Sequence, residues 1–253
     1  MTRLLAALLL LVPLTGCGGP DDGRRQTITV LAAASLTGTF TELAATFEDE
    51  HPGVGVELVF GSSRTLAEQA ADGAPGQVLA TAEEKSMLLA EDGNALRDRP
   101  AAFVSNRLTL ITPPDNPAGI ESLTDLDEPG VDYVVCAETA PCGAVAVAVL
   151  EEAGIAARPA SEEVDVKAVL ARVVQGEADA GLVYRTDALA AGDDIVEVTL
   201  ADPEASSTNY FIAPLQNGDG ESADLADEFV AFVGSNQASK VFGEAGFGGI
   251  VRE

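Results

Sequence analysis

Short apolar, β-branched runs alternate with amphipathic stretches along most of this chain, and this alternation constrains the fold more than any other feature. The first run, Gln26–Ala33 (QTITVLAA), is typical of a buried strand. The stretch Thr39–Glu50 follows with apolar side chains at helical spacing, and the proline and glycine of His51–Gly53 end it. Such alternation predicts an α/β fold in which helices cover both faces of a mostly parallel sheet.

The same pattern continues to the end of the chain. Further strands are expected over Val54–Phe60, Val78–Thr81, Arg107–Ile111, Val131–Cys136, Ala180–Tyr184 and Thr208–Pro214. Further helices are expected over Thr65–Asp72, Ala82–Glu91, Gly143–Ala153, Val166–Gln175, Ala223–Gly234 and Gln237–Gly243. Two blocks of this kind, split near Thr112 and again near residue 200, predict two lobes: residues 27–111 with 201–253, and residues 112–200.

The N-terminal segment is typical of a targeting signal rather than of a folded element. Arg3 precedes the apolar stretch Leu4–Leu14, which is too short to span a bilayer as a stable helix. Leu14–Cys17 (LTGC) then resembles a bacterial lipobox, in which the cysteine is lipidated. We therefore expect residues 1–16 to be a lipoprotein signal peptide, Cys17 to carry the lipid and residues 17–26 to form a tether; a plain secretory signal is the alternative. Either signal places the folded part outside the cytoplasmic membrane, and the lipid would be its only membrane contact.

Charge and histidine content exclude several classes of function. The 253 residues hold 41 Asp and Glu against 14 Lys and Arg, a formal net charge of −27. So acidic a chain offers no basic surface for a nucleic acid and is repelled by anionic membranes. One histidine leaves too few ligands for most metal sites and argues against serine–histidine or cysteine–histidine catalysis.

Two further cysteines, Cys136 and Cys142, lie close together with Pro141 between them. In an oxidising compartment a local disulfide is expected, provided that the intervening loop turns back on itself. Two free buried thiols are the alternative. A zinc site is not expected, because two cysteines and the distant His51 supply too few ligands.

Three expected helix starts carry small polar residues or glycine. They are residues 34–37 (ASLT), 61–65 (GSSRT) and 141–143 (PCG). Ser35 or Thr37 is a natural N-cap for the first helix. The start of a helix presents unpaired N–H groups and a partial positive charge, which together favour an anion. Each start taken alone is also consistent with ordinary capping.

Three longer motifs carry a family resemblance. They are ITVLAAASLTGTFTELAATFEDEHP from Ile28, VELVFGSSRTLAEQAADGAP from Val56, and VDVKAVLARVVQGEADAGLVY from Val164. Together they resemble the periplasmic molybdate-binding proteins of ABC importers, over about residues 27–247. The resemblance implies a two-lobed, type II periplasmic-binding-protein-like α/β fold, with each lobe a mostly parallel sheet flanked by helices and the ligand cleft between the lobes. It also implies a monomer without cofactor that binds molybdate or tungstate and delivers it to an ABC transporter permease.

The resemblance also assigns binding residues. Ser35, Ser63 and Tyr184 match positions that donate hydroxyl hydrogen bonds to the oxyanion, and Cys142 and Val166 match positions that donate backbone N–H groups. Two neighbours, Leu36 and Ser62, are possible additions. The chain departs from the family pattern at Gly76–Gln77, where an Asp is common, and at Arg64, where the residue is usually small.

Neutral donors suit a fully deprotonated dianion, because such an ion offers only acceptors. None of the matched positions is Asp or Glu, so a protonated anion such as hydrogen phosphate would leave its O–H unpaired, at a cost of roughly 1–3 kcal/mol. Sulfate is the harder competitor because it shares the charge and shape of molybdate.

Three alternatives remain. A receptor for sulfate or a small carboxylate is the first, and a carboxylate would call for Arg64 or Arg185 in the cleft. A serine hydrolase using Ser35 or Ser63 is remote, since no G-x-S-x-G motif is present and His51 lies at a helix end. An acidic surface lipoprotein without a ligand is the third.

Overall fold

The computed structural model describes residues 26–202 and 205–250, and it has the predicted α/β architecture. The strands are β1 (Gln26–Ala33), β2 (Val54–Gly61), β3 (Val78–Thr81), β4 (Ala101–Thr112), β5 (Tyr133–Cys136), β6 (Ser161–Glu163), β7 (Ala180–Tyr184), β8 (Val196–Val198) and β9 (Ser207–Pro214). The α-helices are α1 (Thr37–Glu50), α2 (Ser63–Ala71), α3 (Glu84–Asp92), α4 (Pro141–Glu152), α5 (Val166–Val174), α6 (Arg185–Ala191), α7 (Gly220–Val233) and α8 (Asn236–Glu244). Short 3₁₀ turns are η1 (Ala34–Leu36), η2 (Leu123–Asp127) and η3 (Gly192–Asp194).

The strands form one continuous sheet in the order β2-β1-β3-β9-β4-β7-β5-β6, with β8 paired to β4. At one end β1 pairs in parallel with β2 and β3, and at the other β5 pairs in parallel with β6 and β7. The antiparallel strands β9 and β4 join these two parallel groups. The parallel strands therefore point their carboxyl ends, where ligands bind in such sheets, toward the middle of the molecule.

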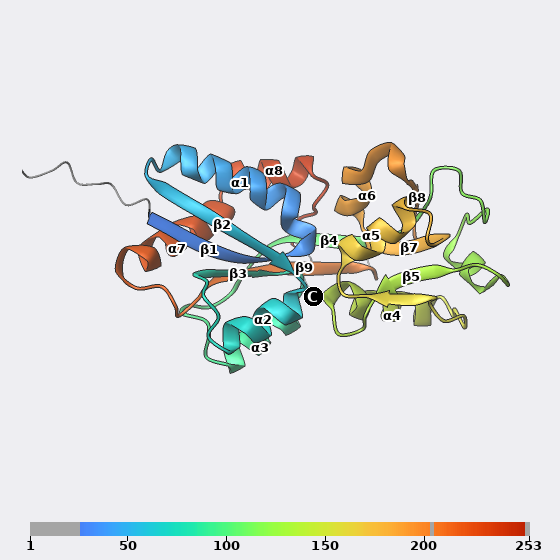
Figure 1. Ribbon diagram of the computed structural model, residues 1–253, viewed down its shortest axis with the longest axis horizontal. Helices are drawn as coiled ribbons and strands as arrows, with labels where there is room; N and C mark the ends of the chain where they lie inside the picture. Colours follow the sequence, from blue (N-terminus) through green and yellow to red (C-terminus); the bar gives the residue numbers. More distant parts are fainter. Residues whose placement is uncertain (1–25, 203–204, 251–253) are drawn as a thin grey trace, which may run out of the picture.

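Two lobes lie side by side along the long axis of the molecule (Figure 1). The first lobe holds β1–β3, with α1, α7 and α8 on one face and α2 and α3 on the other; the second holds β5–β8 with α4, α5 and α6 (Figure 1). Strand β4 belongs to both, because residues up to Arg107 pair with β9 whereas Leu108 and its successors pair with β7. This change of partner precedes the boundary expected near Thr112, and the exact lobe limits stay a prediction.

A cluster of aromatic rings holds the first lobe together. Phe40 of α1 lies 6.2 Å from Phe229 of α7 and 6.3 Å from Phe242 of α8, measured between ring centroids. Phe103 of β4 is 5.4 Å from Phe242, and all but Phe103 are almost completely buried. Edge and tilted contacts of this kind add to the hydrophobic stabilisation of buried aromatic rings. They fix the three helices to one another and to β4.

The structure adds elements that the sequence pattern missed. Strand β4 begins at Ala101, six residues before the expected start, because pairing with β9 overrides the weak local signal. The strands β6 and β8 have three residues each, and α6 follows β7 without any break residue. The expected signal peptide (residues 1–16), lipidated Cys17 and all of the tether except Gln26 lie outside the described residues. In the part that is described, no helix has the length and apolar character needed to cross a membrane.

Candidate anion-binding site

One 3₁₀ turn and the starts of four α-helices meet where the two lobes face each other. Each follows the carboxyl end of a strand: η1 follows β1, and α2, α4, α5 and α6 follow β2, β5, β6 and β7. Thirteen residues from these turns and the end of β3 surround one small cavity, and they are Ala33, Ala34, Ser35, Gly61, Ser62, Ser63, Ala82, Ala140, Pro141, Cys142, Asp165, Val166 and Tyr184. Its volume is about 20 Å³, which is close to the space that one water molecule needs.

Ser63 is the first residue of α2, and its side chain is almost completely buried. The Ser63 hydroxyl oxygen accepts a hydrogen bond from the backbone N–H of Ala82 at 2.9 Å. Its hydrogen therefore remains available for an acceptor in the cavity. The preceding residue, Ser62, occupies the N-cap position without making a side-chain cap, so the α2 start keeps its unpaired N–H groups.

Ser35 lies in the η1 turn rather than at the expected N-cap of α1. The N-cap residue is Leu36, which makes no side-chain cap, and the Thr37 hydroxyl donates back to the carbonyl of Ala34 at 2.6 Å. The capping expectation for Ser35 and Thr37 was therefore wrong. The chain enters α1 through a 3₁₀ turn instead, and the Ser35 hydroxyl lies 2.8 Å from the hydroxyl of Tyr210.

Tyr184 ends β7 and lines the cavity with a side chain that is 1% exposed. Its hydroxyl has no hydrogen-bond partner within the described part of the chain. A buried, unpaired hydroxyl costs free energy unless a ligand satisfies it. Burial, and next the neighbouring Tyr210, raises the pKa of Tyr184 well above its ordinary value, so this group stays a neutral donor.

The start of α4 is held against β5 by a disulfide and by a glycine. Cys136 at the end of β5 and Cys142, the second residue of α4, form a disulfide with Cα atoms 5.7 Å apart. A Cβ atom on Gly143 would lie 2.0 Å from the carbonyl oxygen of Ala137, so only glycine fits there. Because Cys142 is in the first turn of α4, its N–H has no partner within the helix, and Cys142 is one of the residues that line the cavity.

The start of α5 adds a carboxylate that the sequence analysis missed. Val166 is the first residue of α5 and is 2% exposed. Asp165 caps the helix by accepting from the N–H of Ala168 at 3.0 Å, and it also lines the cavity. The cavity is therefore not lined by neutral groups alone. An Asp directly before the apolar periodicity of α5 is the sequence signal that could have revealed this cap.

An ion pair lies behind the cavity in the second lobe. The ammonium nitrogen of Lys167 is 2.7 Å from a carboxylate oxygen of Asp187, whose side chain is 1% exposed. Burial raises the pKa of Asp187 to about 6, although Lys167 acts in the opposite direction. The pair joins the start of α5 to the start of α6, and these two helix starts carry Val166 and Tyr184.

Several predicted residues lie elsewhere. Leu36 is completely buried in the core and does not line the cavity. Arg64 pairs with Glu68 at 2.9 Å on the surface of α2, and Arg185 lies 3.8 Å from Glu197. Neither guanidinium lines the cavity.

The features required for hydrolysis or metal binding are also missing from the cavity. His51, the single histidine, stacks on Phe47 with ring centroids 4.0 Å apart, at the far end of α1. Among residues 26–202 and 205–250, no cluster of three or more His, Cys, Asp or Glu side chains could hold a metal ion.

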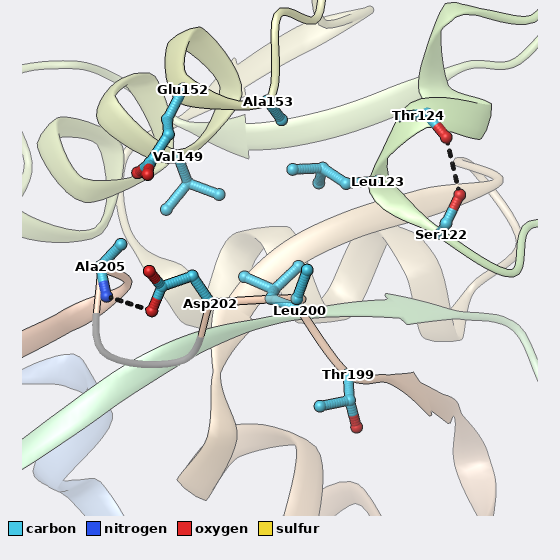
Figure 2. Close-up of a pocket in the computed structure, with 11 residues that line it drawn as sticks. Ser122, Leu123, Thr124, Val149, Glu152, Ala153, Thr199, Leu200, Asp202 and Ala205 are labelled. Atoms are coloured by element: carbon cyan, nitrogen blue, oxygen red, sulfur yellow. Dashed lines mark hydrogen bonds between the residues drawn. The ribbon is translucent and has the colours of Figure 1, made fainter.

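A larger cavity of about 390 Å³ lies within the second lobe, away from the helix starts (Figure 2). Leu123, Val149 and Leu200 line it. The hydroxyls of Ser122 and Thr124 bond to each other at 2.9 Å, and the acidic side chains of Glu152 and Asp202 add to the lining (Figure 2). The small cavity between the lobes is therefore the better candidate for an anion.

Comparison with known proteins agrees with the fold and with the resemblance found in the sequence. The family model for bacterial extracellular solute-binding proteins matches residues 28–248. A molybdate-binding protein, ModA of Mycobacterium tuberculosis, is 34% identical over 96% of this chain and 95% of its own length.

Two solved structures extend the comparison. The substrate binding domain of a putative molybdenum ABC transporter from Clostridium difficile superposes with a TM-score of 0.66 at 27% identity, covering 89% of this chain and 99% of that one. The sulfate-binding protein SubI of M. tuberculosis gives a TM-score of 0.76 at 17% identity, covering 88% and 86%, which shows the shared fold alone. This chain belongs to the family of bacterial extracellular solute-binding proteins, and it is a binding protein rather than an enzyme.

Proposed function

We propose that this chain is the molybdate receptor of an ABC importer. The observation that carries the proposal is the cavity between the lobes, where hydroxyl groups and helix starts converge and where the buried Tyr184 hydroxyl has no hydrogen-bond partner among residues 26–202 and 205–250. The relative that is 34% identical is named as a molybdate-binding protein, which supports the same ligand. Tungstate has the same charge and shape and is expected to bind as well.

The geometry supports the site residues that the family resemblance implies. Ser35, Ser63 and Tyr184 donate hydroxyl hydrogens to the oxyanion, and Cys142 and Val166 donate backbone N–H groups. The partial positive charge at each helix start adds to the attraction without a full cation. Ser62 is a further candidate, whereas the burial of Leu36 in the core limits it to a backbone contribution.

Transport requires the ligand to enter and leave. Residues from both lobes surround the cavity, so we infer that a hinge rotation at the two crossings between the lobes, near Thr112 and near residue 200, opens and closes the site. The Cys17 lipid would hold this monomeric receptor outside the cytoplasmic membrane, where it delivers the ion to the permease. No cofactor is needed for binding or release.

Sulfate is the second candidate ligand, because a cavity of about 20 Å³ favours the smaller of two tetrahedral dianions. A small carboxylate is less well supported, since neither Arg64 nor Arg185 lines the cavity. Asp165 adds a negative charge beside the ligand, which lowers affinity for any dianion, although the α5 helix start partly offsets it.

The test is the melting temperature of the purified chain with molybdate, tungstate, sulfate or phosphate. A ligand at about 1,000 times its Kd adds roughly 4 kcal/mol to the free energy of unfolding, on the order of 10 °C for a protein of this size. We expect this shift with molybdate and tungstate and little with phosphate. A shift in melting temperature with sulfate alone would make sulfate, rather than molybdate, the ligand. No shift with any of the four anions would overturn the proposal.

A further inference from the structure

A chain of buried polar side chains runs from the candidate site across the middle of the molecule. The hydroxyl oxygens of Ser35 and Tyr210 are 2.8 Å apart. The amide nitrogen of Asn106, on β4, donates to the Tyr210 hydroxyl at 3.4 Å and to the Thr186 hydroxyl at 2.8 Å. None of these four side chains is more than 7% exposed. Only Ser35 lines the cavity, and the other three lie behind it.

The Asn106 amide favours one direction for the hydrogen bonds in this chain. The backbone N–H of Arg107 donates to Oδ1 of Asn106 at 2.9 Å, so the amide nitrogen must face Tyr210 and Thr186. An amide nitrogen only donates, and the Tyr210 oxygen therefore accepts from it. Because the Tyr210 oxygen already accepts from Asn106, the remaining contact with Ser35, at 2.8 Å, favours the Tyr210 O–H as its donor. Tyr210 thus donates to Ser35, and the Ser35 hydrogen is left to point toward the cavity.

Packing keeps Tyr210 in this arrangement. Its ring centroid lies 5.5 Å from that of Phe247, 5.8 Å from that of Tyr184 and 6.3 Å from that of Phe103. Burial raises the pKa of Tyr210 far above its ordinary value, so the phenol stays protonated. The ring cannot swing away from Ser35 without displacing the aromatic side chains around it.

We propose that Asn106 and Tyr210 are positioning residues that hold the Ser35 hydroxyl as a hydrogen-bond donor only, and that they thereby select fully deprotonated oxyanions. The inference rests on the proposed function, because it assumes that the ligand is an oxyanion bound by Ser35. It adds residues that do not touch the ligand to those that set its specificity.

The chemical consequence is a discrimination between anions. Molybdate and sulfate offer only acceptors to Ser35, whereas hydrogen phosphate also carries an O–H that needs an acceptor where it faces Ser35. The Asp165 carboxylate is the other acceptor in the lining, although it already accepts from the N–H of Ala168. When Tyr210 donates to Ser35, the serine could accept that proton only through its second lone pair, and its own hydrogen would then turn away from the ligand and lose its acceptor. Without the Tyr210 hydroxyl, the Ser35 oxygen would be free to accept, and hydrogen phosphate would be penalised less.

The variant Tyr210→Phe tests this directly, with Tyr133→Phe as a matched control. Tyr133 is equally buried, but its hydroxyl donates to the carbonyl of Ala157 at 2.7 Å, away from the cavity. Calorimetry at pH 8 gives the Kd for molybdate and for phosphate. We expect Tyr210→Phe to weaken molybdate binding about threefold to tenfold, the scale of one hydrogen bond, and to narrow the molybdate-to-phosphate affinity ratio. Tyr133→Phe should change neither quantity.

A double-mutant comparison shows whether Tyr210 acts through Ser35. In a Ser35→Ala background, Tyr210→Phe should leave the affinity ratio unchanged, because the serine that it orients is gone. The variant Asn106→Asp replaces the donor to Tyr210 by an acceptor, and it should narrow the ratio at least as much as Tyr210→Phe. If Asn106→Asp does not fold, the comparison of Tyr210→Phe with Tyr133→Phe still tests the positioning role.

The outcomes separate this inference from the proposed function. An unchanged ratio in Tyr210→Phe, with the wild type binding molybdate, would overturn the positioning role alone. A wild type that binds sulfate instead of molybdate would overturn the proposed ligand, and the sulfate-to-phosphate ratio would then test Tyr210 in the same way. A wild type that binds no oxyanion would overturn both.

Discussion

The hydroxyl oxygen of Ser63 accepts a hydrogen bond from the backbone N–H of Ala82, at 2.9 Å. This contact joins the start of α2 to the end of β3, and both segments line the cavity. It occupies the serine oxygen as an acceptor and leaves its hydrogen for a ligand. Ser63 therefore has a structural and a binding role at the same time.

Ser63→Ala should lower both stability and affinity. Loss of the acceptor leaves the Ala82 N–H unpaired, and loss of the donor removes a bond to a charged ligand, each worth roughly 1–3 kcal/mol. The matched control is Ser86→Ala, since Ser86 is equally buried but donates to Glu83 at 2.7 Å and lies outside the cavity. Titration and urea unfolding measure the two effects. Wild-type affinity in Ser63→Ala would remove this serine from the site.

Tyr184→Phe should separate affinity from stability. The hydroxyl that it removes has no partner among the described residues, so the free energy of unfolding without ligand should stay the same or rise slightly. Oxyanion affinity should fall about tenfold to a hundredfold, as for a lost bond to a charged group. Tyr133→Phe should lower the free energy of unfolding and leave oxyanion affinity unchanged, because it loses the bond to Ala157 but leaves the cavity intact. Loss of stability without loss of affinity in Tyr184→Phe would contradict the assignment.

Gly143→Ala should displace the start of α4. Its Cβ would lie 2.0 Å from the Ala137 carbonyl oxygen, so the helix must shift, at a cost of roughly 1–3 kcal/mol or more. Anion affinity should fall with it, because the Cys142 N–H moves. Gly38→Ala is the control in the first turn of α1, where a Cβ meets nothing within 4 Å, and it should stabilise the protein slightly. Equal effects of the two substitutions on binding would argue against a role for α4.

Asp187→Asn should change the pH dependence of stability. The pKa of Asp187 is raised by burial to about 6, from 3.8, so the folded chain holds this proton between about pH 4 and 6 when the unfolded chain has released it. The contribution of Asp187 to stability therefore falls as the pH rises through this window.

Urea unfolding at a series of pH values measures this effect. The stability of the wild type relative to Asp187→Asn should decline by on the order of 2–3 kcal/mol between pH 4 and 6. Asp92→Asn, which removes a charge from the surface of α3, controls for net charge. If the free energies of unfolding of wild type and Asp187→Asn change in parallel with pH, the Asp187 carboxyl does not titrate between pH 4 and 6.

The sequence pattern predicted the α/β fold and most of the long elements, because strands such as β1 and helices such as α1 are strongly periodic. It did not predict α6, which follows β7 directly, or the three-residue strands β6 and β8. Those elements depend on pairing and packing partners that are distant in the chain. The early start of β4 has the same cause.

Most of the candidate site could also be predicted, but mainly from the family resemblance, because the periodic pattern itself singled out only the helix starts that carry Ser35, Ser63 and Cys142. Ser35, Ser63, Cys142, Val166 and Tyr184 all line one cavity. The contact between Ser35 and Tyr210 could not be foreseen, because it joins residues 175 positions apart. The role of Ser35 in the η1 turn, in place of an N-cap, depends on this distant partner.

Anomalous X-ray diffraction at the molybdenum edge, from crystals of the chain grown with molybdate, tests most directly whether the ion binds between the lobes. We expect a single strong peak in the cavity between the lobes, with the ion's oxygens within hydrogen-bond distance of Ser35, Ser63 and Tyr184. A peak in the larger cavity beside Leu123 and Leu200, or no peak when the ion is in excess, would contradict it.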